Sequence, residues 1–492
     1  MTRHARHLMH HVSRGVATAT LALVALAGGC ASLDPKADID RAAHTVNDRS
    51  GVAPGWDGPW DVSLSTWDGR SHLTVELALG MALRNNRDIR SKVELIAASR
   101  ADLVQAGLLP NPVVGLTLRF PFDPVSGGTF VGAQVVQSFA ALWLRGGKIR
   151  AADARLNQTV LDVSDQALAL VAQVKASHTR IAFGQRAVGL AEQNLATIQK
   201  SIDSLDARVR GGEGTTLDVN RARQQLAKAE AERVVVMREL AKERRRMLEL
   251  IGFAAENADW AVDEGALESA PQTLDEATVI ALAGSQRLDV AAARSVALAQ
   301  SADLSVEQRS HLRDLGLGAD FERSESGDKS IGPVVELAIP IFDTNEAQIA
   351  KAGSIARAAF GSYEAASQRA VREARVAWIE LDSASRLVEQ YRSTVLALAE
   401  RNLTLAEASL RSGQADVTVL LEAQREVTDA RARLNDLEQA AALARIELEY
   451  AVGGVLAWPP TPGPDPLDRG PSTIGAGTPP KGLDEVPSGA RQ

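Results

Sequence analysis

The chain has a single cysteine, Cys30, so it can form no intramolecular disulfide, and its stability must come from packing. No apolar run after this cysteine approaches the roughly twenty residues of a membrane-spanning helix. A helical span is therefore excluded, whereas a β-barrel is not, because its strands carry a much weaker sequence signal. The formal net charge of −8, carried by mixed charges, argues against a nucleic-acid partner.

Residues for catalysis are also scarce. Beyond Cys30 the histidines are few and widely scattered: His44, His72, His178 and His311. No Gly-rich phosphate loop follows a strand, and no Ser-His-Asp cluster can be assembled. The sequence therefore predicts a protein that is not an enzyme and that carries no cofactor and no metal ion of its own.

The first thirty residues are typical of an export signal. Arginines make a basic start, an uncharged apolar run covers 16–27, and small residues precede Cys30. The segment resembles a bacterial lipobox, with Ala27 where that motif usually has leucine. Acylation of Cys30 would anchor the protein by lipid, and the alternative is an ordinary secretory signal with an incidental cysteine. Ala31, in place of an aspartate, favours sorting to the outer membrane.

Self-similarity organises the rest of the chain. We align Ala78 with Ala277, a separation of 277 − 78 = 199, and Gly212 with Gly413, a separation of 413 − 212 = 201. A spacing held to within two residues over this length indicates a duplication. Each unit is expected to contain a helix, two short strands, a long helix, a tight turn and a second long helix.

Spacings of three and four between apolar residues predict the long helices. The stripe of the second unit consists of Val427, Ala430, Leu434, Leu437, Ala441, Ala444 and Leu448. A similar stripe in the first unit consists of Leu226, Ala229, Val236, Leu240, Met247 and Leu250. No proline lies between Lys148 and Gly211, so an unbroken helix of roughly 65 residues, or about 100 Å, is expected there. A rod of this length suits a structure that crosses the periplasm.

Alternating apolar and polar residues predict four strands, at 113–120, 129–136, 315–322 and 331–341. On the first of them the apolar face consists of Val114, Leu116, Leu118 and Phe120. Apolar residues facing out and polar residues facing in, at about ten residues per strand, are the pattern of a transmembrane β-barrel. A soluble hairpin packed on the helices is the alternative, and the export signal favours the barrel.

Four strands cannot close a barrel, and open edges are not tolerated in lipid because their backbone groups would lack partners. The chain is therefore expected to form a homotrimer with twelve strands, and the four long helices of each protomer would make a tube of twelve beneath them. The expected fold class is mainly α with a small β part: a trimeric α-helical tunnel joined to a 12-stranded barrel.

These features together resemble the TolC-like outer-membrane efflux proteins over residues 73–453. The resemblance rests on the repeat, on Leu-Thr-Val-Glu-Leu-Ala at 73–78, on Gly-Leu-Leu-Pro-Asn-Pro at 107–112 and on the glycine of each hairpin turn. It implies the outer-membrane channel of a tripartite efflux pump, working with a periplasmic adaptor and an inner-membrane pump. The outer-membrane component of a type I secretion system and a non-conducting coiled-coil lipoprotein are the alternatives.

The resemblance also implies two kinds of site. Adaptor docking is expected at the hairpin tips, which are Gly211, Gly212, Glu213, Ser412, Gly413 and Gln414. A periplasmic gate is expected just past the second tip, where the two ring positions fall at Val419 and Glu422 and only Glu422 is acidic. Asp218, the counterpart of Val419 in the first unit, belongs either to the constriction or to the bonds that lock it. For both carboxylates a solvated helix face is the alternative.

The expected domain organisation follows from these features. It comprises a signal peptide at 1–29, an irregular segment at 30–70, a first repeat at 71–270, a second repeat at 271–453 and a disordered Pro- and Gly-rich tail at 454–492. The expected location is the outer membrane of a Gram-negative bacterium, with a lipid anchor and a long periplasmic part.

Overall fold

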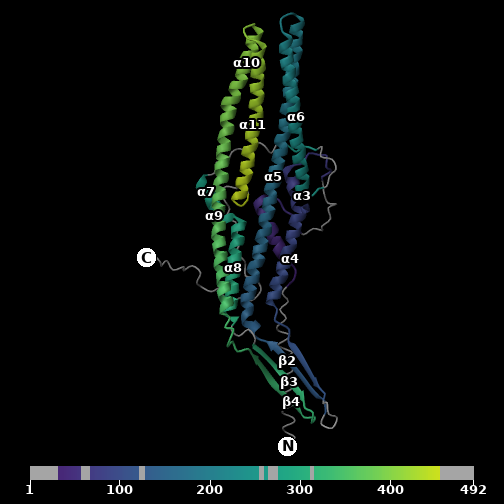
Figure 1. Cartoon of the computed structure of the whole chain (residues 1–492), viewed down its shortest axis with the longest axis vertical. Helices are drawn as coiled ribbons and strands as arrows, with labels where there is room; N and C mark the ends of the chain where they lie inside the picture. Colours follow the sequence, from purple (N-terminus) through teal and green to yellow (C-terminus); the bar gives the residue numbers. More distant parts are fainter. Residues whose placement is uncertain are drawn as a thin grey trace, which may run out of the picture. The chain divides into compact units, whose positions relative to one another are not determined.

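The computed structural model describes residues 32–56, 67–120, 128–253, 260–263, 275–310 and 315–454. All the elements discussed below lie in one compact unit, Pro35–Thr461 (Figure 1). Within the described ranges the fold is mainly helical with one four-stranded sheet, which confirms the mainly α protomer with a small β part that the sequence predicted. None of the helices described is long and apolar enough to cross a membrane.

Each repeat begins with two short helices, where the sequence predicted one. The four helices are α3 (Val75–Asn85), α4 (Arg87–Gly107), α7 (Glu276–Gln286) and α8 (Leu288–Gln308). Asn86 and Arg287 separate the members of each pair, with extended backbone at ψ of 121° and 127°. The Asn86 side chain accepts bonds from the N–H groups of Asp88 and Ile89. Because it satisfies the free donors of α4, Asn86 ends one helix and starts the next.

The longest element is α5 (Ala140–Arg210), which has 71 residues and a length of about 105 Å. It begins eight residues before Lys148, the expected start, and runs through the adjacent Gly146 and Gly147, which in the sequence looked like a break before the helix. At Gly147 a side chain is excluded, since a Cβ atom there would lie 2.5 Å from Val306 of α8. The helix therefore tolerates glycine where a neighbouring helix approaches closely.

Two hairpins of long helices lie side by side (Figure 1). The first hairpin consists of α5 and α6 (Thr216–Leu250). The second hairpin consists of α9 (Glu346–Gln390), η4 (Tyr391–Leu396), α10 (Ala397–Arg411) and α11 (Val417–Ala451). Helix α11 packs against both α5 and α9, whereas α6 packs mainly on α5, and α10 on α11. The order across the hairpins is thus α6, α5, α11 and then α9 with α10.

The predicted apolar seam of α11 is confirmed. Val427, Ala430, Leu437 and Leu448 are buried, and the other three positions of the stripe are half-buried. Val427 and Ala430 pack against η4 and α10, and Leu448 packs against α7 and α9.

The sheet has the order β1-β2-β3-β4 and is antiparallel throughout. Its strands are β1 (Val113–Arg119), β2 (Phe130–Ser138), β3 (Leu315–Arg323) and β4 (Lys329–Leu337). One row of paired residues is Leu116, Ala133, Phe321 and Ile331, and the next row is Thr117, Gly132, Glu322 and Ser330. Because directly paired residues share a face, one face is apolar and the other polar, as the alternation predicted.

Strand β4 ends four residues before Ile341, where the sequence placed its end. Its last residue, Leu337, pairs with Leu315, the first residue of β3, and Pro340 follows three residues later. A second proline, Pro333, lies inside β4, which is possible because β4 is an edge strand of the sheet.

The two repeats share one register. The starts of α3 and α7 are separated by 276 − 75 = 201, and the starts of α4 and α8 by 288 − 87 = 201. The alignment of Ala78 with Ala277 was therefore wrong by two residues. Ala78 corresponds to Val279, and both are fully buried, whereas Ala277 is exposed. Burial decides how the two repeats align, because a shift of two residues would expose the apolar face of the helix to solvent.

The segment expected to be irregular, 30–70, contains helix α2 (Lys36–Ser50). Ala42 and Val46, four residues apart, are fully buried in the core that α3, α4 and α5 share. After the helix, the Trp56 indole N–H donates to the Leu83 carbonyl at 3.0 Å. The apolar spacing within α2 was a helical signal that the nearby Trp, Pro and Gly residues obscured.

Candidate functional site

The six residues predicted at the tips all lie in the turns that end the two hairpins. All of them are exposed: Gly211, Gly212, Glu213, Ser412, Gly413 and Gln414. Gly212 and Gly413 have φ of 80° and 72°, a conformation that glycine adopts without steric cost. The sequence therefore located both turns and identified the glycine that each one requires.

The two turns also share their hydrogen bonds. The N–H of Glu213 donates to the Arg208 carbonyl at 2.9 Å, and that of Gln414 donates to the Ser409 carbonyl at 2.9 Å. Both bonds connect residues five apart around a left-handed glycine, which is the Schellman ending of a helix. The tips thus present two copies of one backbone shape with different side chains.

The helices that leave the tips are capped by side chains. Thr215 and Asp218 form a capping box at the start of α6, in which the Thr215 hydroxyl donates to Asp218 Oδ2 at 2.6 Å. Asp218 Oδ1 also lies 3.8 Å from Arg221. At the position equivalent to Thr215, Asp416 caps α11, and hydrogen bonds from Thr418 and from the Val417 N–H lower its pKa. The Asp218 carboxylate is therefore committed to the start of its own helix.

The ends of the two hairpins share an apolar cluster. Val417 and Leu421 of the second hairpin are buried against residues of the first: Ile198, Ile202, Leu205, Val219, Ala222 and Ala229. The structure thus places the predicted gate residues Asp218 and Glu422 at the same end of the two hairpins, each next in sequence to a member of this cluster.

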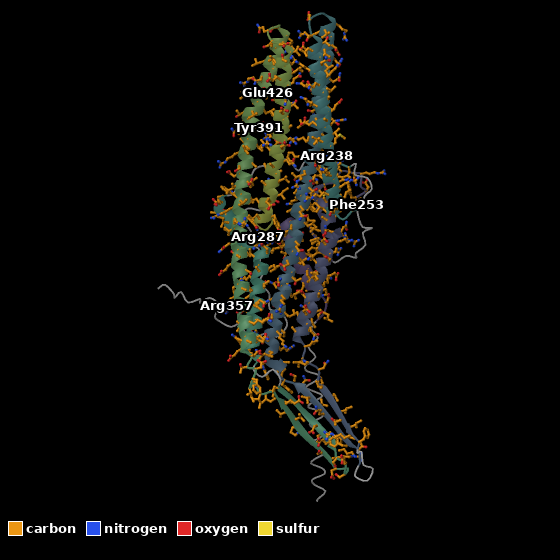
Figure 2. All side chains as sticks on the ribbon, in the orientation of Figure 1. Arg238, Phe253, Arg287, Arg357, Tyr391 and Glu426 are labelled. Atoms are coloured by element: carbon orange, nitrogen blue, oxygen red, sulfur yellow. The ribbon has the colours of Figure 1, made fainter. Side chains whose placement is uncertain are left out.

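Glu422 itself is exposed, next to the buried Leu421. Among the described residues it has no ion-pair partner, and Val419, the other predicted ring position, is 47 % exposed. Glu426, one turn further along α11, is exposed as well (Figure 2). In the isolated chain α11 thus presents Val419, Glu422 and Glu426 to solvent close to the second tip.

Polar contacts between α5 and α11 were not predicted from the sequence. Near the tips the Ser201 hydroxyl donates to Gln424 Oε1 at 3.2 Å, and the Thr428 hydroxyl donates to Asn194 Oδ1 at 3.2 Å. In the sequence these residues appear as polar positions at helical spacing beside an apolar seam. Without knowing the partner helix, such positions cannot be told from a solvent-exposed helix face.

Further from the tips these contacts become charged. Glu438 of α11 accepts from Arg186 of α5 at 2.6 Å and from Arg392 of η4 at 2.5 Å. Lys175 of α5 donates to Glu449 of α11 at 2.8 Å. The polar contacts between the hairpins are therefore ion pairs at Glu438 and Glu449 and neutral hydrogen bonds nearer the tips, where the apolar cluster also joins the two hairpins.

A buried charged group lies where α8 begins. Arg287 donates to Asp289 at 2.8 Å and to Glu373 of α9 at 2.7 Å. Burial alone would lower the pKa of Arg287, but the two carboxylates raise it above its usual value. Burial, helped by Asp289, raises the pKa of the nearby Asp165 carboxyl on α5 to about 6. The bonds of Arg287 join the start of α8 to α9, and the Asp165 carboxyl of α5 is close enough to feel the charges of this group.

Within the described ranges, no group of three or more His, Cys, Asp or Glu side chains is placed to hold a metal ion. His178 is a buried residue of the core, and its Nε2 atom lies 3.1 Å from the Leu73 carbonyl oxygen. Cys30, the predicted lipidation site, lies outside the described residues, as do the predicted signal peptide and residues 455–492.

The part of the chain that matches a known protein family coincides with the two repeats. A protein family described as "Outer membrane efflux protein" matches residues 78–252 and 279–454. The starts of the two matches are separated by 279 − 78 = 201, the same value as for the helices.

Individual relatives cover most of the chain. It is 27 % identical over 463 residues to the outer membrane protein OprJ of Pseudomonas aeruginosa, covering 88 % of this chain and 94 % of that protein. It is 24 % identical over 363 residues to the cobalt-zinc-cadmium resistance protein CzcC of Cupriavidus metallidurans, covering 73 % of this chain and 85 % of that protein. The crystal structure of CusC superposes with a TM-score of 0.66 at 19 % identity, over 83 % of this chain and 98 % of that one.

Proposed function

Because the chain belongs to the outer membrane efflux protein family and is an outer-membrane efflux channel, we propose that it is the exit duct through which an inner-membrane pump and a periplasmic adaptor discharge their cargo. One observation supports this most directly. Two long helical hairpins and an antiparallel sheet with one apolar face occur in a single duplicated chain. The hairpins suit a duct through the periplasm, and the sheet suits the membrane.

The sheet supports assembly into a trimer, which family membership implies. β1 and β4 are its open edges, and both carry strongly exposed apolar residues, such as Leu116 at 76 % and Ile331 at 79 %. In lipid an unpaired edge is very costly, because its backbone groups have no water to bond. Pairing β1 of one copy with β4 of the next would remove every edge and give a barrel of twelve strands.

The helical hairpins have open sides as well. Helices α6 and α10 flank the order described above, and each exposes apolar residues to solvent in the single chain. They are Val234, Val235 and Met237 on α6 and Leu398 and Leu405 on α10. Contact between α6 of one copy and α10 of the next would bury both sets and close a tube, as a head-to-tail interface in a ring requires.

The tips are the proposed contact with the adaptor. Their six residues are exposed, and each tip is held by a Schellman turn that fixes its backbone. A rigid tip loses little conformational freedom when it binds, which favours a specific contact. The side chains that differ between the tips, such as Glu213 and Gln414, would then decide which adaptor is accepted.

The proposed periplasmic gate uses Glu422. Three copies around a three-fold axis would bring three carboxylates towards the pore, where like charges attract cations and resist crowding. Asp218 has a different part in this proposal. Its carboxylate closes the capping box with Thr215, so it braces the helix that supports the cluster at the tips instead of lining the pore.

Attachment to the membrane is proposed to include a lipid on Cys30. The export signal and the small residues before this cysteine support acylation. A lipid chain contributes about 0.8 kcal/mol per buried methylene, so it would add to the hold of the barrel on the outer membrane.

Reconstitution tests the proposal. The purified protein in detergent should be a trimer by native mass spectrometry and should form discrete conducting channels in planar bilayers. A photoreactive residue at position 213 or 414 should cross-link in cells to a periplasmic adaptor, whereas one at Arg357, far from the tips (Figure 2), should not. A trimer without conductance would favour the non-conducting lipoprotein, and capture of the adaptor of a protein exporter would favour type I secretion.

A further inference from the structure

An open cavity lies where the two helical hairpins come together. Its volume is about 590 Å³, and its walls belong to α5, α6, α9 and α11 (Figure 1). Small-molecule sites in proteins have volumes of about 300–1,000 Å³. The cavity residues on α5 run from Ala169 to Arg180, about 45–60 Å along the helix from its start next to β2. The cavity is therefore well away from the sheet that is proposed to enter the membrane, and a membrane lipid does not fit this position.

The cavity lies on the side of α5 that faces away from the packed core. Ala172 and Ala176 line it. Val174 is fully buried in the core that α2, α3 and α4 share with α5, and the ring of His178 contacts the Leu73 carbonyl on that side. Residues two positions apart on an α-helix point about 200° apart, so the cavity and this core occupy opposite sides of α5. In the proposed tube α2 and α3 would block the bore if they lay inside, so the cavity belongs to the inner wall.

The charged residues at the cavity are divided between its two sides. Arg180 of α5 and Arg246 of α6 belong to the first hairpin. Glu380 of α9 and Glu447 of α11 belong to the second. Within the part of the chain that the structure describes, the side chains of Arg180, Glu380 and Glu447 have no hydrogen-bond or ion-pair partner, and Arg246 lies 4.0 Å from Glu243. The cavity therefore offers positive charge on one side and negative charge on the other.

Two further charged residues at the cavity, Arg372 and Glu373, are bonded to protein groups. Arg372 lies 3.6 Å from Glu373, and Glu373 also accepts a bond from Arg287 at 2.7 Å. Because their charges are already matched, they change the balance of charge across the cavity little.

The rest of the cavity is lined mainly by small and apolar side chains. Among them are Ala169, Ala172, Ala176, Val376, Ala377 and Ala444. Short side chains leave the hollow open, and an apolar lining favours an apolar ligand because contact removes both surfaces from water. The ligand is therefore expected to combine an apolar body with charged groups.

We propose that this cavity binds a zwitterionic amphiphile, a molecule with an apolar body, an acid group at one end and an amine at the other. Arg180 and Arg246 hold the acid group by charge-assisted bonds, and Glu380 and Glu447 hold the amine. The cavity is open, so the bound molecule stays partly hydrated and is held weakly, as passage through a duct requires. This inference rests on the proposed channel function, because it names the class of cargo that the tunnel wall recognises.

Both charges of the ligand are needed. A molecule with an acid group alone meets the unpaired carboxylates of Glu380 and Glu447. A molecule with an amine alone meets the two arginines. Like charges at close range repel, so each of these molecules binds more weakly than the zwitterion.

Equilibrium dialysis of the purified protein in detergent tests the site with three naphthalene derivatives of similar size. They are aminomethyl-naphthoate, which is zwitterionic, naphthoate, which is anionic, and naphthylmethylammonium, which is cationic, and detergent without protein gives the background. We expect the parent to bind the zwitterion about tenfold more tightly than either of the other two. Arg180→Gln and Glu447→Gln should each lower the affinity for the zwitterion about tenfold, the change expected from the loss of one charge-assisted bond.

The matched control is Arg245→Gln. Arg245 is exposed on α6 next to Arg246 but does not line the cavity, so this variant loses the same charge and should bind the zwitterion as the parent does. Ala176→Leu fills the hollow without changing any charge and should weaken binding of all three compounds. Equal weakening by Arg180→Gln and Arg245→Gln would overturn the site, as would unchanged binding in Ala176→Leu. Equal binding of the three compounds by the parent would overturn the selection of a zwitterion.

Current measurements in planar bilayers separate the site from the channel. Aminomethyl-naphthoate should block the current of the parent for short periods and should block that of Arg180→Gln less. Binding together with a current that the compound does not change would overturn the position of the cavity on the inner wall. Binding without any conductance would leave the site standing and refute the channel, whereas conductance without binding would refute the site alone.

Discussion

Gly212 and Gly413 occupy the same position in the two tip turns, one in each repeat, with φ of 80° and 72°. Nothing lies within 4 Å of the position where a Cβ would be at either glycine. The space is therefore open, and only the backbone conformation requires glycine. Replacement at these positions separates the shape of the turn from the contacts around it.

We expect Gly212→Ala and Gly413→Ala each to cost about 1 kcal/mol, because an L-residue disfavours the left-handed conformation by about that amount. Hydrogen exchange should rise at the Glu213 and Gln414 amides, whose bonds close the turns, and binding to the adaptor should weaken. Gly189→Ala is the control, since this glycine lies inside α5 with nothing within 4 Å of its Cβ position and no positive φ. An equal effect at Gly189 would remove the special role of the turns.

The lipid anchor gives a second prediction. Cys30→Ala should abolish incorporation of labelled palmitate and weaken retention in the outer membrane, because a buried acyl chain contributes about 0.8 kcal/mol per methylene. The labelled band should be absent from the variant and present in the parent. A parent protein that takes up no label would refute acylation.

The two faces of the sheet give a third. Leu317 pairs with Val335 on the apolar face, and Glu336 pairs with Gly316 on the polar face. Leu317→Arg should cost about 2–4 kcal/mol, the range for a cation on the lipid side of a barrel, and should reduce the yield of trimer in detergent. Glu336→Arg should assemble normally. Equal damage from both changes would mean that the faces are assigned wrongly.

The proposed gate gives a fourth prediction. Glu422→Ala should raise single-channel conductance in planar bilayers and reduce block by divalent cations, since it removes carboxylates from the proposed constriction. Glu426→Ala, one turn further on, should do less. Asp218→Ala should have an intermediate effect, because it loses the capping box, at a cost of about 1 kcal/mol, and not a charge in the pore. Unchanged conductance and block in Glu422→Ala would return this residue to a solvated helix face.

The fifth prediction concerns pH. The pKa of Asp165 is raised from 3.8 to about 6 by burial first and then by Asp289. The folded state therefore holds the proton more tightly than the unfolded state, and stability is lost as pH rises from about 4 to about 6. This loss is absent in Asp165→Asn. At pH 7 the variant should therefore have a free energy of unfolding higher than that of the parent by up to about 3 kcal/mol, and should melt at a higher temperature.

At pH 4 the Asp165 carboxyl is largely protonated in the folded chain, and the two melting temperatures should lie close together. Thermal unfolding of the trimer in detergent at a series of pH values provides the measurement. A difference between variant and parent that does not change from pH 4 to pH 7 would show that this carboxyl does not titrate in the window.

Much of the fold could be predicted because its signals are local. The seam of α11, the alternation in β1 and β3 and the glycine of each tip all follow from periodicity or from backbone conformation within a few residues. The helix boundary at Asn86 was not predicted, because two short helices separated by one capping residue look like a single interrupted helix in the sequence. The two-residue error at Ala78 arose because alanine matched alanine, whereas burial pairs Ala78 with Val279.

The site was less predictable because its contacts join distant parts of the chain. Glu438 binds arginines that are 252 and 46 residues away in the sequence. Helical and strand periodicity relates residues only a few positions apart, so it could not predict either contact. The π-helix η4 has no sequence signature, since Tyr391–Leu396 contains no residue that disfavours an α-helix strongly. Asp218 illustrates the opposite case, because Thr215 three residues before it was a recognisable capping signal.

Arg49 of α2 donates to the carbonyl oxygen of Gly453 at 2.9 Å and also to that of Gln286. The helix that precedes the first repeat is thus bonded to Gly453, two residues beyond the last helix of the second. When the two ends of a domain meet, the fold does not depend on where the chain starts. A circular permutant that begins with the second repeat should therefore keep the same contacts, because the architecture does not require the first repeat to precede the second along the polypeptide.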